Sequence, residues 1–121
     1  MRNSLVNSFK CAFSGIAYTC VTGRNFKIQL GFAVLATVLG LAFAISPLEW
    51  AVIFVCMGVV LGGECVNTSI ESIVDLVSPD YHELAGRAKD CAAGGVLVCS
   101  IASVGVAAAI FLPKMVALVL A

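Results

Sequence analysis

Two long stretches without a charged residue limit what this chain can fold into. Residues 28–48 form one such run of 21 residues, and residues 91–113 form another of 23. The hydrocarbon core of a bilayer is about 30 Å thick, which an α-helix crosses in roughly 20 residues. The sequence is 61% hydrophobic and 12% charged, with a mean hydropathy of +1.08. We therefore predict an all-α integral membrane protein in which residues 1–121 form a single membrane-embedded domain.

A further span is predicted between these runs, at residues 50–77, although it carries polar groups. We expect Pro47 to end the preceding span, with the Glu and Trp that follow at the headgroup boundary. Within residues 50–77, four polar residues fall within about 80° of one another at roughly 100° per residue. They are Glu64, Asn67, Glu71 and Asp75. Because such groups are costly against lipid, they must face protein, water, a metal ion or a ligand.

The segments outside the spans are shorter and more polar. Apolar residues recur at helical spacing over residues 5–20, which predicts an amphipathic helix on the membrane surface; burial against the rest of the bundle is the alternative. Residues 78–80 are expected to end the middle span, and residues 81–90 to become helical again before Lys89. Basic residues precede the first and third spans, whereas only Lys114 lies beyond the third, so the N-terminus and the polar segment are predicted to face the cytoplasm.

Composition also excludes several kinds of site. The net charge is zero and the seven basic residues are scattered, which is unlike a nucleic-acid-binding surface. The six Cys residues form no C-x-x-C pair and have no ligand spacing to the single His. We therefore expect neither a zinc site nor disulfides, and interpret the Cys residues as packing residues.

The polar face of the middle span could support phosphoryl transfer. Two carboxylates seven residues apart, with an amide between them, can hold Mg²⁺ and leave one carboxylate as a base. Lys89 and Asp90 could return to the same site, since a cation and a helix N-terminus both favour phosphate. No Walker A motif is present. The residues alone leave three other interpretations open: the polar row could seal a helix bundle, form an oligomer interface or line an ion path.

Residues 64–90 resemble the motifs of a known family. Residues 64–75 read E-x-x-N-x-x-x-E-x-x-x-D, and residues 81–90 read Y-H-x-L-x-x-x-A-K-D. Both are similar to elements of the small prokaryotic integral-membrane diacylglycerol kinases. The resemblance continues more weakly in S-F-K-x-A-F-x-G-I at residues 8–16 and R-N-F-K-I at residues 24–28.

This resemblance implies a fold and an activity. It implies a protomer with three spans and an N-terminal surface helix, assembled as a homotrimeric bundle in the cytoplasmic membrane. It implies transfer of the γ-phosphate of Mg²⁺-bound ATP to a lipid hydroxyl, that of diacylglycerol or undecaprenol. By the same resemblance, Glu64 would be the general base, Asn67 a positioning group and Glu71 a Mg²⁺ ligand. The nucleotide-binding residues would be Asp75, Asp80, His82, Lys89 and Asp90.

The chain departs from the family pattern at one position. Members of the family usually carry a second metal-binding Glu two residues before the Asn of R-N-F-K, where this chain has Gly23. The metal site would then be completed by ATP oxygens, water or another side chain such as Gln29, or the enzyme would be slow or inactive. A non-catalytic helical membrane scaffold that keeps the family fold is therefore the alternative function.

Overall fold

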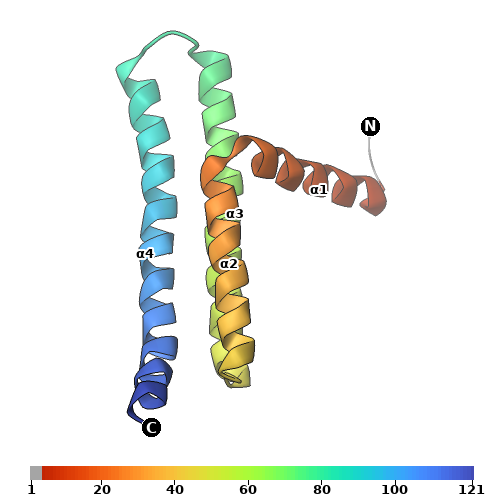
Figure 1. The fold of residues 1–121 in the computed structure, drawn as a ribbon. Coiled ribbons are helices and arrows are strands. Elements are labelled where there is room, and N and C mark those ends of the chain that lie inside the picture. The colour runs from red at the N-terminus through yellow and green to blue at the C-terminus, as the bar shows by residue number, and fades with distance from the viewer. Residues whose placement is uncertain (1–3) are drawn as a thin grey trace.

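A computed structural model describes residues 4–121, which form four helices and no strand. The helices are α1 (Leu5–Thr22), α2 (Arg24–Ala42), α3 (Pro47–Val77) and α4 (Glu83–Leu120). Figure 1 shows α2, α3 and α4 running alongside one another while α1 projects sideways from them. Three helices, α2, α3 and α4, are long and apolar enough to cross a membrane. The all-α fold with three spans is therefore confirmed.

The corner between α1 and α2 turns at a single residue. Gly23 donates its amide hydrogen to the carbonyl of Thr19 at 2.7 Å, and α2 begins at the next residue. A Cβ atom at position 23 would lie 2.6 Å from that carbonyl oxygen, so glycine permits this close turn. Residues 5–20 are helical as predicted, and several large apolar side chains of α1 are exposed, among them Phe9 and Phe13. Its placement on the membrane surface stays a prediction.

The turn between α2 and α3 differs from the prediction. The first span was expected to reach residue 48, but α2 ends at Ala42, and Ala44 turns the chain with a φ of 48°. Pro47 does not end a span: it occupies the first turn of α3, where its missing N–H costs nothing. Ser46 caps this helix in a reciprocal capping box with Glu49, whose backbone N–H donates to the Ser46 hydroxyl at 3.2 Å.

The last helix also extends beyond its predicted end. The third span was expected to end at Pro113, whereas α4 continues through this residue to Leu120. Proline removes one helical N–H, and membrane helices tolerate this because neighbouring groups accommodate the freed carbonyl. Lys114, the next residue, forms an ion pair of 2.7 Å with Glu49 and so joins α4 to the start of α3.

A buried apolar cluster packs the helices together at the end of the bundle that holds this ion pair. Ile45, Ile53 and Phe111 form a buried cluster there. Gly40 lets α2 approach Trp50 closely, because a Cβ atom at this position would lie 2.6 Å from the indole ring. Most other large apolar side chains are exposed, as expected for helices whose surroundings are hydrocarbon.

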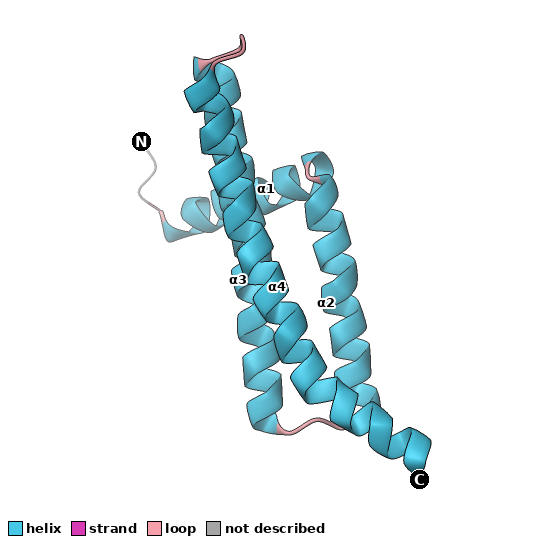
Figure 2. Ribbon diagram, turned by 90° about the vertical axis from the view of Figure 1, so that its left-hand side faces the viewer, coloured by secondary structure: helices cyan, strands magenta, loops and turns pink. Residues whose placement is uncertain are grey.

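Helices α3 and α4 are longer than α2, and their extra length carries the polar residues beyond the level of α1. At 1.5 Å per residue, the 19 residues of α2 span about 28 Å, whereas the 31 of α3 and 38 of α4 span about 46 and 57 Å. Figures 1 and 2 show the connection between α3 and α4 standing well beyond the level of α1. The motif residues 64–90 therefore run from the level of α1 to this projecting end.

Candidate active site

The deepest polar residues of the predicted site lie at the level of α1. Glu64 is 3% exposed and Asn67 is 7% exposed, and they are the two buried polar side chains of α3. Thr19 of α1 lines a cavity of about 230 Å³ together with Cys65 and Thr68 of α3. Helix α1 therefore meets α3 near the turn that carries Glu64 and Asn67.

Asn67 connects this buried level with the next turn of α3. Its Nδ2 donates a hydrogen bond to Glu71 Oε1 at 3.1 Å, and the Glu71 side chain is exposed. Asn67 Oδ1 is buried and has no hydrogen-bond partner among residues 4–121. Buried amide oxygens in native proteins almost always have a partner. The site thus presents an acceptor that a donor from a ligand or from water can satisfy.

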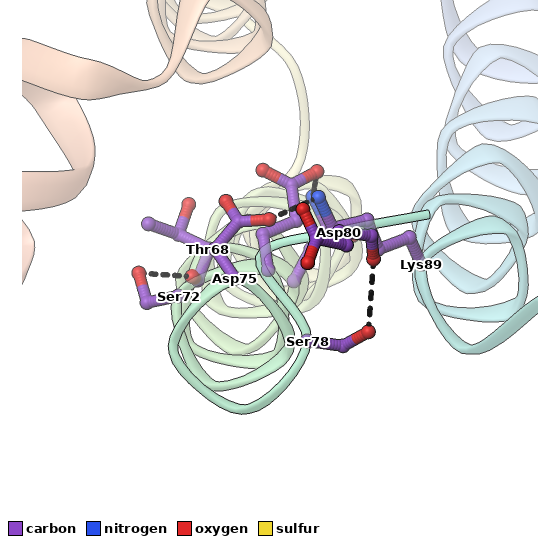
Figure 3. Close-up of polar contacts among 8 residues, drawn as sticks. Thr68, Ser72, Asp75, Ser78, Asp80 and Lys89 are labelled. Carbon is purple, nitrogen blue, oxygen red and sulfur yellow. Dashed lines mark hydrogen bonds and ion pairs between the residues drawn. The ribbon is translucent and has the colours of Figure 1, made fainter. Parts of the chain in front are cut away.

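The projecting part of the site is held by a contact between α3 and α4. Lys89 Nζ donates to Asp75 Oδ1, and the two side chains are 38% and 66% exposed. Figure 3 draws this pair with the polar groups around it. The Ser78 hydroxyl donates to the carbonyl of Asp80 at 3.1 Å and orders the start of the connection. The prediction that Lys89 returns to the polar face is confirmed, although its role in binding stays a prediction.

The remaining predicted site residues lie at the connection itself. His82 is the N-cap of α4, and its Nδ1 accepts the backbone N–H of Leu84 at 3.2 Å. Sequence reasoning missed this structural role because the usual N-caps are Ser, Thr, Asp and Asn. Asp80 and Asp90 are exposed near the same end of the bundle. The part of the chain that the structure describes brings no three His, Cys, Asp or Glu side chains into a metal-binding group.

The donor set still fits a magnesium ion. Mg²⁺ is usually held by one or two carboxylates, with water and substrate phosphates completing its shell. The Glu71 carboxylate and the unpartnered Asn67 Oδ1 are hard oxygen donors on adjacent turns. Gln29, the candidate for completing the metal site, instead donates to Ser100 Oγ of α4 at 2.9 Å. Its side chain is thus held toward α4, and its part in the metal site stays a prediction.

The cysteines differ in burial. Cys11 and Cys91 are exposed, whereas the others, Cys20, Cys56, Cys65 and Cys99, are partly buried. The predicted packing role suits the four partly buried residues and does not suit the two exposed ones.

Comparison with known proteins agrees with the motifs. Residues 10–111 match the family model described as prokaryotic diacylglycerol kinase. An undecaprenol kinase of Bacillus subtilis (strain 168) is 39% identical over 113 residues, which cover 93% of this chain and 92% of the relative. A diacylglycerol kinase of Synechocystis sp. is 39% identical over 95% of this chain and 66% of its own length. That of Escherichia coli (strain K12) is 35% identical, with 77% and 76% covered. The chain belongs to the prokaryotic diacylglycerol kinase family.

Proposed function

We propose that this membrane lipid kinase transfers the γ-phosphoryl group of ATP, in a Mg²⁺-dependent reaction, to the hydroxyl of a long-chain lipid. The names of its relatives provide two candidates, undecaprenol and diacylglycerol. The observation that carries the proposal is the arrangement of α3. The buried carboxylate of Glu64 and the buried amide of Asn67 lie at the level of α1, and Asn67 Oδ1 has no hydrogen-bond partner among residues 4–121. The charged groups of Asp75 and Lys89 are more exposed and lie further along α3 and α4.

This arrangement separates the two substrates by depth. We place the lipid hydroxyl where α1 meets α3, at the level of Cys65, the residue that follows Glu64. The triphosphate is water-soluble and suits the exposed part of the site, where Lys89 projects from α4. Glu64 and Glu71 are seven residues apart, or about 10 Å along the helix axis. An extended triphosphate can cover this distance, so the two substrates can meet near Glu64.

The proposed reaction moves one proton and one phosphoryl group. Glu64 accepts the proton of the lipid hydroxyl as the new oxygen–phosphorus bond forms and the bond between the γ-phosphorus and the bridging oxygen breaks. Asn67 Oδ1 accepts a hydrogen bond from an ordered water and so helps to position the hydroxyl, whose single proton goes to Glu64. Lys89 neutralises phosphate charge, and Glu71 would hold the magnesium ion, which supplies further charge neutralisation when bound. Asp75, Asp80, His82 and Asp90 complete the proposed nucleotide contacts.

The proposed orientation follows from the basic residues. Arg24 and Lys27 start α2, and Arg87 and Lys89 lie in the first turns of α4, at the same end of the bundle. Lys114 lies at the opposite end, paired with Glu49. The excess of positive charge supports a cytoplasmic location for the site, where ATP is available, in the cytoplasmic membrane.

A homotrimer is the proposed assembly. The family to which the chain belongs and the exposed position of Glu71 on a single chain support it. A neighbouring copy can cover this carboxylate. Cross-linking in a native membrane preparation should give trimers, and a monomer as the sole species would contradict this assembly.

Labelled ATP tests the proposed reaction. Purified protein in detergent is incubated with γ-labelled ATP, Mg²⁺ and either undecaprenol or diacylglycerol, and the extracted lipid is counted. The matched control is the same lipid with its hydroxyl acylated, which offers the same chain without an acceptor. We expect label in at least one free alcohol and none in the acylated control. Label in neither alcohol would favour the non-catalytic scaffold.

A further inference from the structure

Among residues 4–121, two ion pairs join α3 to α4, one near each end of α3. Lys114 Nζ of α4 donates to Glu49 Oε2 of α3 at 2.7 Å, and Lys89 of α4 pairs with Asp75 of α3. The two carboxylates are 26 residues apart on α3 and the two lysines 25 apart on α4, or about 39 and 38 Å at 1.5 Å per residue. Because the two helices run in opposite directions, both pairs form in the same register of α4 against α3.

Apolar packing gives this register little support. Of the 38 residues of α4, only Val96 and Phe111 are buried. A Cβ atom added at Gly94, Gly95 or Gly105 would meet open space within 4 Å. Helices are held in register by side chains of one that insert between those of the other. Since α4 has few such side chains, its position along α3 depends on the polar contacts.

The proposed phosphate contact depends on this register more than the rest of the site does. Glu64, Asn67 and Glu71 all lie on α3, so a single helix fixes their spacing. Lys89 lies on α4 and meets the site only where the two helices are held together. A shift of α4 by one turn would move Lys89 by about 5.4 Å, whereas a hydrogen bond joins atoms about 3 Å apart. Such a shift would weaken the phosphate contact and leave the groups on α3 in place.

The pair formed by Glu49 and Lys114 is the more sheltered of the two. Its side chains are 27% and 30% exposed, against 66% for Asp75 and 38% for Lys89. Exposed charges are screened more strongly by water and salt. An ammonium of Lys89 that turns to phosphate also leaves Asp75, which weakens the link at that end. The link between Glu49 and Lys114 then holds the two helices in register.

We infer that Glu49 and Lys114 are positioning residues for ATP, because their ion pair holds α4 in the register that presents Lys89 to phosphate. They act from a distance of about 38 Å along α4 and touch neither substrate. Residues 10–111 match the family model, so Lys114 lies outside the matched residues. The inference rests on the proposed kinase activity and adds a contribution from the opposite end of the bundle.

Removing the ion pair from either side tests this inference. Lys114→Met deletes the ammonium and keeps a long side chain. Glu49→Gln deletes the charge and keeps an oxygen for the cap of α3, where Glu49 Oε1 accepts the backbone N–H of Ser46 at 3.1 Å. Each variant should raise the dissociation constant for a fluorescent ATP analogue with Mg²⁺ by up to about fivefold, the limit set by a partly exposed ion pair. Lys114→Arg keeps the pair and should bind the analogue like the wild type.

Two further measurements separate positioning from a loss of stability. The double variant Glu49→Gln/Lys114→Met should bind the analogue no more weakly than either single variant, because both changes act through one pair. The KM for the lipid alcohol should stay within about twofold of the wild type, since the groups proposed to hold the hydroxyl lie on α3. A smaller folded fraction would lower the rate and leave both constants unchanged. An unchanged dissociation constant in both single variants overturns the inference, and so does an equal rise in the lipid KM.

Zero-length cross-linking follows the register without nucleotide or turnover. A carbodiimide joins an amine to a carboxylate in contact with it, and mass spectrometry measures the product that links Asp75 to Lys89. Its yield should fall in Lys114→Met by up to about fivefold, for the same reason as above, and stay at the wild-type level in Lys114→Arg. Equal yields in the two variants overturn the inference.

These results also distinguish the inference from the proposed function. A lower cross-linking yield and weaker analogue binding in Lys114→Met, with no lipid phosphorylated by the wild type, would support the inference and contradict the proposed kinase activity alone. Phosphorylation by the wild type, with equal yields and equal dissociation constants in Lys114→Met and Lys114→Arg, would contradict the inference alone.

Discussion

Removing the Lys89 ammonium should separate its role in nucleotide binding from its role in the fold. The pair with Asp75 is a largely exposed ion pair, and such pairs contribute roughly 0.2–1 kcal/mol to stability. A contact between an ammonium and phosphate is a charge-assisted hydrogen bond of about 1.5–3 kcal/mol. Lys89→Met should therefore leave the free energy of unfolding within about 1 kcal/mol of the wild type. It should raise the dissociation constant for Mg²⁺-bound ATP roughly 10- to 150-fold.

Both quantities can be measured on one preparation. Binding is followed by titration with a fluorescent ATP analogue in the presence of Mg²⁺, and stability by unfolding in the same detergent. Lys27→Met is the matched control, because it removes one positive charge at the same end of the bundle and Lys27 has no assigned part in the site. If Lys89→Met weakens ATP binding no more than Lys27→Met does, Lys89 does not contact phosphate and the reasoning is refuted.

Other substitutions test the metal site and the packing. Glu71→Gln should raise the half-saturating Mg²⁺ concentration roughly tenfold in the lipid phosphorylation assay, since an amide replaces a carboxylate ligand; an unchanged requirement would exclude Glu71 as that ligand. Gly23→Glu should be more active than Gly23→Ala, the control for strain at the close turn, because its carboxylate adds a metal donor; equal rates would count against a limiting carboxylate. Gly40→Ala should lower the free energy of unfolding by about 1–3 kcal/mol, because its Cβ atom would clash with the Trp50 ring. Gly31→Ala, in open space, should be neutral or stabilising, and equal effects of these two alanines would refute the packing argument.

Hydropathy and helical periodicity predicted the spans and the polar face, but not the ends of helices in apolar sequence. Residues 43–46 carry no charge, so nothing in composition distinguished the turn at Ala44 from more helix. Pro47 was interpreted as a helix end, although it is equally compatible with a helix start. Pro113 was interpreted in the same way, although α4 continues through it.

The candidate site was predicted as far as its parts lie on one helix. Glu64, Asn67 and Glu71 share a face because of helical spacing alone. Contacts between helices could not be found in this way. Gln29 meets Ser100, 71 residues away, and this contact depends on how α2 packs against α4. The register of α4 against α3 likewise exists only in the packed bundle, so no motif indicates it.

The most direct test of the account is the behaviour of Glu64→Gln. Glutamine keeps the shape of this buried side chain and cannot accept the hydroxyl proton, and a positioned base contributes about 10²- to 10⁴-fold to a rate. Lipid phosphorylation and binding of Mg²⁺-bound ATP are measured on the same purified variant. The account predicts a fall in kcat of at least about 10²-fold with the ATP dissociation constant within about twofold of the wild type. Turnover close to that of the wild type, or loss of ATP binding in parallel with activity, would contradict it.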